Sequence, residues 1–293
     1  MKRIKLLYVL LILLSSCSKQ ENNQQDTDSF TSNIKTGKII KSVNVAAIKR
    51  DYIVHIPEQY NGKAPLPLLL CFHGLTSNME FNYSYTKFYE LAEQENFIVV
   101  HPNGLSNKWT VNALNNPDID FVETLLNQLE LDYNIDSSRI YSTGMSNGGF
   151  FSFSLACNLS NRIAAVASVT GTMFGPLINN CTPTRPLPIL QIHGTKDDIV
   201  EYSTALNALD YWKTHNKTSL TPIISNMPDF DDKDGSTVQR FDYVNTDNNI
   251  EVRHFKIIGG GHDWPGFKGN MDINATVQVW NFVKKFSLNG KIN

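Results

Sequence analysis

Short apolar runs alternate with longer segments of helical periodicity along most of the chain. Residues 66–72 form a continuous apolar run, which is typical of a strand that a sheet buries on both faces. Residues 120–133 place Phe121, Leu125 and Leu129 on one side of a helix, which gives that helix an apolar face to lay on a sheet. The two patterns predict strands over 38–45, 52–56, 66–72, 96–100, 139–143, 163–169, 188–193, 238–244 and 251–258, and helices over 120–133, from about 148, over 203–214 and from about 272.

This order of elements indicates an α/β fold with a mostly parallel central sheet and helices on both faces. The first two strands are expected to form a β-hairpin. In such sheets the functional residues gather at the carboxyl ends of the strands. With 293 residues, of which 41% are hydrophobic and 18% charged, the chain suits one large domain, which we assign to residues 37–293.

The N-terminus has the pattern of an export signal. Five residues rich in Lys and Arg precede the apolar run Leu6 to Leu14, which is short for a transmembrane helix. The sequence Leu14-Ser15-Ser16-Cys17 resembles the bacterial lipobox, so residues 1–17 are expected to be a lipoprotein signal with Cys17 lipidated. Residues 18–36 are then a polar tether. The alternatives are a plain signal peptide and a short anchor helix. We expect an extracytoplasmic protein, lipid-anchored to a bacterial outer membrane or cell surface.

Charge and cysteine content narrow the choice of partners. A net charge of −2 provides no broad basic field, so nucleic acid is not an expected partner, whereas a small-molecule or oligosaccharide substrate is. The membrane contact is expected only through the N-terminal lipid anchor. In an oxidising compartment we favour a disulfide between Cys157 and Cys181, with two independent buried thiols as the alternative. Cys71 lies in an apolar run and is expected to be a buried thiol.

A serine lies between a predicted strand and a predicted helix. Gly144-Met145-Ser146-Asn147-Gly148 has the pattern of a nucleophile elbow, in which a sharp turn holds the serine hydroxyl out of the sheet. The glycines are needed because a side chain there would strike the neighbouring strand or helix. The bare pattern also arises by chance, and its position between a strand and a helix is what gives it weight.

A nucleophilic serine needs a base, and the base needs an acid to fix its tautomer. Asp197 follows the predicted strand 188–193, and His262 follows 251–258 after three glycines, which gives the chain order serine, acid, histidine. We therefore predict Ser146, Asp197 and His262 as catalytic residues. The backbone N–H groups of Asn147 and Leu75 are expected to form the oxyanion hole.

Five motifs in order resemble the secreted esterases of the α/β-hydrolase superfamily that include polyhydroxybutyrate depolymerases, feruloyl esterases and acetylxylan esterases. The resemblance implies the α/β-hydrolase fold, the three catalytic residues above and a disulfide that matches Cys157 and Cys181. The chain departs from the family pattern at Asn103, Glu201 and Asp263. The motifs are His73-Gly74, residues 101–104 with Trp109, residues 144–149, residues 193–197 with Val200 and Tyr202, and residues 260–266.

The expected reaction is hydrolysis of a carboxylic ester through an acyl-enzyme, without a cofactor or a metal. The acidic run at 229–234 does not match an EF-hand, because Phe230 and Phe241 fall at ligand positions. The alternatives are a peptidase of the same superfamily and a lipoprotein that only binds a ligand.

Substrate contacts are expected from aromatic residues on loops. Trp109, Tyr202 and Trp264, with Phe267 as a further candidate, could stack on a sugar or a phenolic acid. The alternative is that Trp109 and Trp264 only pack the loops around His262. We expect small acyl or aromatic acyl esters of saccharides to be better substrates than polyhydroxybutyrate.

Overall fold

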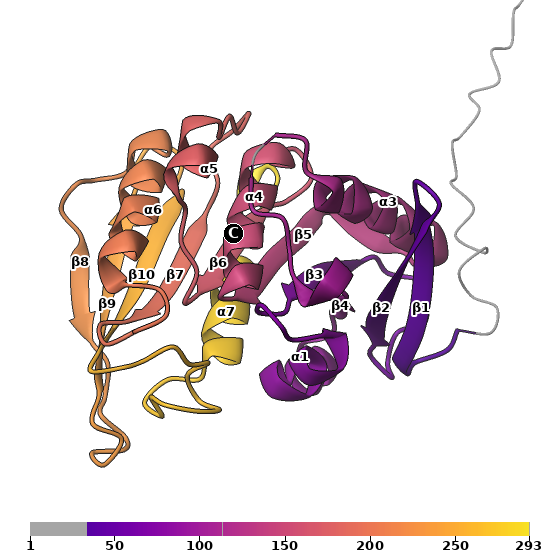
Figure 1. The fold of residues 1–293 in the computed structure, drawn as a ribbon. Helices are drawn as coiled ribbons and strands as arrows, with labels where there is room; N and C mark the ends of the chain where they lie inside the picture. Colours follow the sequence, from indigo (N-terminus) through magenta and orange to yellow (C-terminus); the bar gives the residue numbers. More distant parts are fainter. Residues whose placement is uncertain (1–33, 113, 293) are drawn as a thin grey trace, which may run out of the picture.

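A computed structural model describes residues 34–112 and 114–292 (Figure 1). The signal segment, Cys17 and nearly all of the tether lie outside the described residues. One large sheet runs through the molecule, with ten strands in the order β1-β2-β4-β3-β5-β6-β7-β10-β9-β8. The strands are β1 Gly37–Val45, β2 Ile48–Ile56, β3 Leu66–Phe72, β4 Ile98–Pro102, β5 Ile135–Met145, β6 Ala165–Val169, β7 Ile189–Gly194, β8 Ile223–Asn226, β9 Thr237–Val244 and β10 Glu251–Ile258.

The middle of the sheet is parallel and its two sides are antiparallel. Neighbouring strands from β4 through β3, β5, β6 and β7 to β10 all run in the same direction. The predicted hairpin of β1 and β2 adds one antiparallel side, and β9 with β8 adds the other. The carboxyl ends of the parallel strands therefore lie along one edge, where the loops after β3, β5, β7 and β10 meet.

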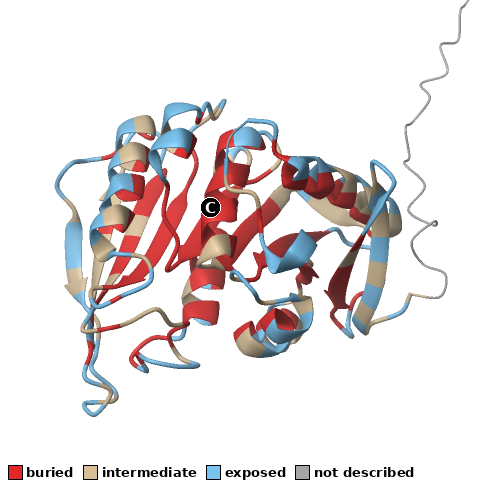
Figure 2. Ribbon diagram, in the orientation of Figure 1, coloured by how far each residue is buried: buried red, intermediate tan, exposed pale blue. Residues whose placement is uncertain are grey.

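Helices cover both faces of this sheet, as predicted. On one face, α3 (Pro117–Asp132), α4 (Asn147–Asn158) and α6 (Tyr202–His215) bury their apolar sides in one hydrophobic cluster. On the other face, α2 (Phe88–Glu95) and α7 (Ala275–Val283) pack into a second cluster. Figure 2 shows the central strands almost wholly buried between these two layers.

Several short elements were not expected from the sequence. They are α1 (Met79–Thr86), α2, α5 (Gly175–Asn179), β8 and the small pair β11 (Phe286–Ser287) and β12 (Gly290–Lys291). In α1 the apolar pattern fails, because Phe81 is exposed while the polar Asn82 is buried. In α7, Val277 is exposed because it lies on the outer side of that helix.

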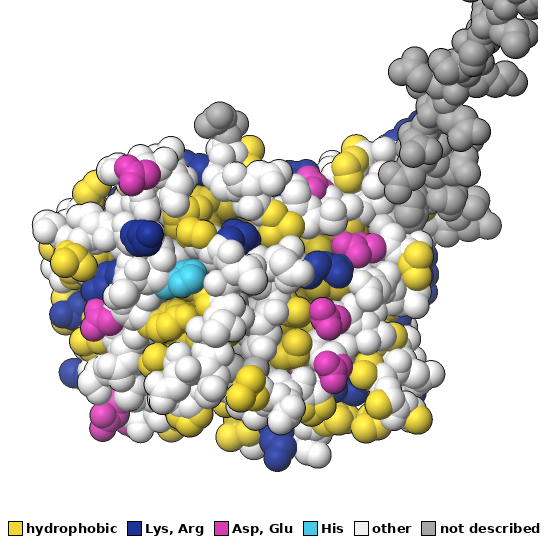
Figure 3. Space-filling model, turned by 90° about the horizontal axis from the view of Figure 1, so that it is seen from above, with side chains coloured by type: hydrophobic (Ala, Val, Ile, Leu, Met, Phe, Trp, Pro, Cys, Tyr) yellow, Lys and Arg dark blue, Asp and Glu magenta, His cyan; other side chains and the backbone are white. Residues whose placement is uncertain are grey.

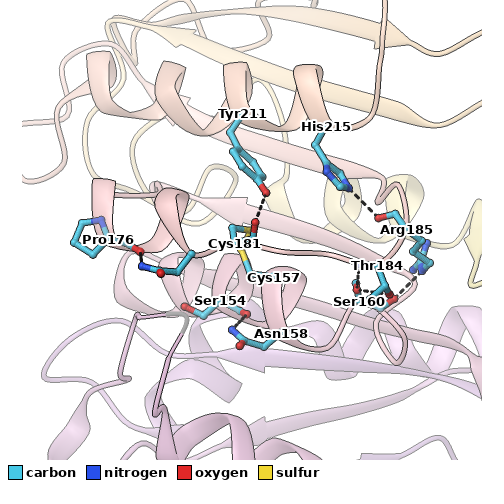
Figure 4. Close-up of a disulfide and its surroundings, with 11 residues drawn as sticks. Ser154, Cys157, Asn158, Ser160, Pro176, Cys181, Thr184, Arg185, Tyr211 and His215 are labelled. Atoms are coloured by element: carbon cyan, nitrogen blue, oxygen red, sulfur yellow. Dashed lines mark hydrogen bonds between the residues drawn. A yellow bond between two sulfur atoms is a disulfide. The ribbon is translucent and has the colours of Figure 1, made fainter.

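Cys157 and Cys181 form the predicted disulfide (Figure 4). It joins the last turn of α4 to the segment after α5. The Tyr211 hydroxyl on α6 donates a hydrogen bond to the carbonyl oxygen of Cys181 (2.9 Å), so that α4, α6 and the segment after α5 are connected at this point. Cys71 is a buried free thiol, and burial raises its pKa to about 12.

The surface carries charges of both signs. On the face in Figure 3, Lys and Arg side chains are interspersed with Asp and Glu, and hydrophobic atoms lie between them. Within residues 34–112 and 114–292, no helix is long and apolar enough to cross a membrane. The same residues contain no group of three His, Cys, Asp or Glu side chains placed to hold a metal ion.

Candidate active site

Ser146 occupies a strained turn between β5 and α4. Its backbone angles are φ 54° and ψ −120°, a combination that costs energy for any residue with a side chain and that clusters at functional sites. Its N–H donates to the Val169 carbonyl (2.9 Å), and its carbonyl accepts from the Phe150 N–H (2.9 Å). These bonds fix the turn to β6 on one side and to the helix on the other.

The two glycines of this turn are required by close backbone contacts. A Cβ atom added to Gly148 would lie 2.2 Å from the carbonyl oxygen of Phe72 on β3. A Cβ added to Gly144 would lie 2.5 Å from the carbonyl carbon of Gly148. Both separations are far inside van der Waals contact. The structure thus bears out the steric reason that the sequence suggested for these glycines.

Asp197 and His262 meet above the ends of β7 and β10. The Nδ1 of His262 lies 2.8 Å from Oδ2 of Asp197. The acid side chain is fully buried, whereas 16% of the His262 side chain is exposed, so only the histidine can reach a ligand. Because an ionised carboxylate only accepts hydrogen bonds, Nδ1 of His262 must donate, and Nε2 is left as the basic nitrogen.

Backbone hydrogen bonds hold the loop after β7, which carries Asp197, against the loop after β10, which carries His262. The Thr195 N–H donates to the carbonyl of Ile257, and the Lys196 N–H donates to that of Gly260, each over 2.8 Å. Gly194 permits this approach, because an added Cβ would lie 2.3 Å from the Gly260 oxygen. The acid and the histidine are therefore positioned by main-chain bonds between their own loops.

Asp197 is kept ionised by its neighbours. Burial by itself raises the pKa of this carboxyl, but hydrogen bonds from His193, from His262 and from the backbone of Val200 outweigh it and hold the pKa below its usual range. Its Oδ1 accepts from the N–H groups of Ile199 (3.0 Å) and Val200 (2.8 Å). A carboxylate held in this way orients the imidazole and does not take its proton.

His193 contacts the carboxylate of Asp197 and helps to hold it in place, a role that sequence reasoning missed. Its Nε2 donates to the Val200 carbonyl (2.8 Å) and lies 3.2 Å from Oδ2 of Asp197. Its Nδ1 then accepts from the side-chain amide of Gln191 (3.2 Å). The available signal was its position, four residues before Asp197 at the end of a buried strand.

The loop after β3 lies beside Ser146 and supplies a free N–H. A Cβ added to Gly74 would lie 3.7 Å from the Cβ of Ser146. The Nδ1 of His73 donates to the Gly74 carbonyl (2.8 Å), while its Nε2 accepts from the Gly104 N–H (2.9 Å). Since a peptide group is planar and trans, anchoring that carbonyl turns the Leu75 N–H the opposite way.

Asn147 is the second predicted donor. Its side chain binds the backbone of Trp109 twice, accepting from its N–H (2.7 Å) and donating to its carbonyl (3.1 Å). Among the described residues, the N–H groups of Leu75 and Asn147 donate to no other group. Two free donors near one serine hydroxyl are the arrangement that an oxyanion hole requires.

Ser146, His262 and Leu75 line one pocket of about 370 Å³. The structure contains no hydrogen bond from the Ser146 hydroxyl to His262 within the described residues, a contact that commonly tightens only when substrate binds. Most of the remaining wall comes from α1 and from the loop after His262. The lining residues are Gly74, Leu75, Ser77, Phe81, Asn82, Tyr85, Met145, Ser146, His262, Asp263, Phe267 and Lys268.

The structure contradicts two of the three predicted substrate contacts. Trp109 is 3% exposed and Trp264 is 1% exposed, so neither ring offers a face to a ligand. The Trp109 indole donates to the His73 carbonyl (2.9 Å), and that of Trp264 donates to Oγ1 of Thr276 (3.1 Å). Both rings pack the loops around the site, which was the alternative interpretation.

Tyr202 lies outside the pocket lining as well. Its hydroxyl is paired with Nε2 of His254 (2.9 Å), and its ring packs edge-on against His193. The aromatic residues that do line the pocket are Phe81 and Tyr85 on α1 and Phe267 on the loop after His262. The spacing of four between the first two could have revealed them if residues 79–86 had been identified as a helix.

Comparisons with known proteins find a matching family and similar sequences. Residues 102–243 match the family described as Phospholipase/Carboxylesterase. The bifunctional acetylxylan esterase/xylanase XynS20E of Neocallimastix patriciarum is 28% identical over 242 residues, covering 82% of this chain and 34% of the relative. Feruloyl esterase D of Neurospora crassa is 25% identical, covering 87% of this chain and 88% of the relative. The chain thus spans about a third of the length of the first relative and most of the second.

Solved structures give the fold. The acetyl xylan esterase from Aspergillus awamori matches with a TM-score of 0.65 and 13% identity, covering 84% of this chain and 99% of that one. A ferulic acid esterase from Anaeromyces mucronatus in complex with ferulic acid matches with a TM-score of 0.56 and 14% identity, covering 88% and 95%. The chain has the α/β-hydrolase fold, and its sequence is similar to those of acetylxylan and feruloyl esterases.

Proposed function

We propose that this α/β hydrolase cleaves carboxylic esters, with Ser146 as nucleophile, His262 as general base and Asp197 as the acid that orients it. One observation carries the proposal: the buried Asp197 holds Nδ1 of His262 at 2.8 Å, in a pocket that also contains Ser146 on its strained turn. Three elements distant in sequence thus bring a nucleophile, a base and an orienting acid to one edge of the sheet.

The reaction follows from these positions. The Ser146 hydroxyl attacks the ester carbonyl while Nε2 of His262 takes its proton, and the N–H groups of Leu75 and Asn147 bind the oxygen that becomes negative. The C–O bond to the alcohol then breaks, and His262 returns the proton to that alcohol. Water repeats the sequence on the acyl-enzyme, with His262 as base, and releases the acid.

The pocket favours an acyl group with apolar character. Phe81, Tyr85 and Phe267 surround a volume of about 370 Å³, enough for an aromatic acid. Asn82 adds a hydrogen-bond acceptor to the pocket. Its Nδ2 donates to the Cys71 carbonyl (2.9 Å), and its Oδ1 has no partner among the described residues. We propose acetyl or feruloyl-type esters of saccharides as substrates, in preference to polyhydroxybutyrate. The named activities of the relatives support this choice.

The test combines a probe with a substitution. A fluorophosphonate should label the wild type and not Ser146→Ala, and Ser146→Ala should lower ester turnover about a millionfold, because the three residues act as a unit. Hydrolysis should also persist in EDTA. Labelling or hydrolysis that survives in Ser146→Ala would overturn the assignment. A panel of acetyl, feruloyl and polyhydroxybutyrate substrates then ranks the acyl groups by kcat/KM.

We also propose that the protein is exported and anchored through lipidated Cys17, with residues 37–293 as its catalytic domain. The Cys157–Cys181 disulfide supports an oxidising compartment. Cys17→Ser should move the protein from the membrane fraction to the soluble fraction, because the acyl chains supply the membrane affinity. Fractionation followed by immunoblotting measures this, and a variant that still sediments with membranes contradicts the anchor.

A further inference from the structure

A second hollow of about 260 Å³ lies next to the active-site pocket. Tyr85 and Phe267 line both hollows and pack edge to face, with ring centroids 4.4 Å apart. This pair is therefore the common wall between the two. Because Phe267 is 49% exposed, this boundary is open to solvent. A substituent on the substrate can therefore extend over it from the active-site pocket into the second hollow.

The second hollow differs from the first in its chemistry. Two residues with side-chain amides line it: Gln94 on α2 and Asn274, the residue that caps the start of α7. The Oδ1 of Asn274 caps α7 by accepting from the Val277 N–H (3.1 Å), which leaves its Nδ2 free. Gln94 makes no side-chain hydrogen bond within the described part of the chain. Both amides can therefore bind a ligand.

The charged residues of the hollow balance one another. The Lys87 ammonium lies 3.6 Å from the Glu90 carboxylate, and both line the hollow. An anion would meet the carboxylate and a cation would meet the ammonium, so the site suits a neutral ligand. Free amides, an ion pair and an aromatic edge together match the hydroxyl groups and apolar ring faces of a sugar.

We propose that this second hollow binds the saccharide portion of an ester whose acyl group occupies the Ser146 pocket. The inference rests on the proposed ester hydrolysis and extends it to the alcohol side of the substrate. The carbonyl carbon must lie at Ser146, so the two halves of the ester diverge from that point. The low wall of Tyr85 and Phe267 directs the sugar toward Gln94 and Asn274. The binding energy gained there raises kcat/KM for saccharide esters and leaves simple esters unaffected.

The experiment compares two esters of the same acid, a methyl ester and a xylo-oligosaccharide ester, using the full chain. In Gln94→Ala/Asn274→Ser, which removes both amides while the serine hydroxyl can still cap α7, kcat/KM for the saccharide ester should fall about tenfold, the value of two modest hydrogen bonds, and kcat/KM for the methyl ester should be unchanged. The matched control is Gln278→Ala/Asn281→Ala on α7, which also removes two polar side chains outside both hollows and should leave both rates unchanged. A variant that slows both esters equally, or neither, overturns the proposal.

A binding measurement separates this inference from the proposed function. Xylotriose carries no ester, so its binding, followed by a ligand-detected NMR titration, does not depend on catalysis. We expect the wild type and the α7 control to bind it and Gln94→Ala/Asn274→Ser to bind it about tenfold more weakly. Equal binding by all three proteins, or none by the wild type, refutes the sugar site even if ester hydrolysis is found. Absence of hydrolysis with selective xylotriose binding would refute the esterase alone.

Discussion

Asp197 and Asp198 are adjacent carboxylates in opposite surroundings. Asp197 is buried and receives hydrogen bonds from His262 and from two backbone N–H groups, whereas Asp198 is exposed. The motif places Asp197, and not Asp198, at the acid position, and in the structure the Asp197 side chain is the one that turns inward.

We therefore expect Asp197→Asn to lower ester turnover by about four orders of magnitude, because an amide at that position favours the wrong tautomer of His262. Asp198→Asn, the matched control, should change turnover less than about twofold, since surface substitutions away from special features have small effects. Steady-state kinetics on one soluble ester decides between them. If Asp198→Asn were the damaging change, the roles of the two residues would be exchanged.

Residues whose role depends on chain order were predictable, and residues whose role depends on exposure were not. Ser146 and His262 stand out because glycines surround them and because predicted strands precede them. Trp109 and Trp264 have the right residue type for a sugar platform, but both are buried, and nothing in the local sequence distinguishes an indole that packs a loop from one that faces a ligand.

At the scale of elements, the buried strands were the easiest to predict. β3 begins and ends where its apolar run does, since both faces of a central parallel strand are covered. α1 was missed because one side of it faces the active-site pocket and so carries Phe81 and Tyr85 in place of a continuous apolar stripe. A helix that lines a ligand site loses the pattern by which helices are predicted.

The disulfide that ties α4 to the segment after α5 should contribute substantially to stability. Its cysteines are separated by 24 residues. Closing a loop of that length removes unfolded-chain entropy worth about 3.5 kcal/mol. We expect Cys157→Ala/Cys181→Ala to lower the free energy of unfolding by about this amount in urea titrations.

Activity provides the control for that substitution. Cys157 lies in the last turn of α4 and Ser146 precedes its first turn, so the disulfide is far from the chemistry. The variant should keep its kcat at temperatures where it remains folded. Reducing agent should destabilise the wild type similarly and leave the variant unchanged. A variant with the same free energy of unfolding as the wild type would contradict the stabilising role of the disulfide.

At the scale of the whole molecule, buried neutral histidines couple stability to pH. Burial lowers the pKa of His254 to about 3, and burial likewise lowers that of His101 to about 3. His254 lies in β10 between Tyr202 and Gln191, and both its ring nitrogens are hydrogen-bonded there. In the unfolded chain each imidazole takes up a proton below its ordinary pKa of about 6.5.

The sign of the effect follows from that difference. Between pH 6.5 and 3 the unfolded state binds more protons than the folded state, so the stabilisation is complete above about pH 6.5 and is lost as the pH falls toward 3. Over this range, each buried histidine should lower the free energy of unfolding by about 1.4 kcal/mol for each pH unit of acidification. His254→Gln cannot take up the proton, so its free energy of unfolding, measured in urea at several pH values, should fall with a slope shallower by that amount between pH 6 and 4. The comparison of slopes removes any constant cost of the substitution, and carboxylates contribute equally to both proteins. Equal slopes in the two proteins would mean that His254 is not held neutral by its burial.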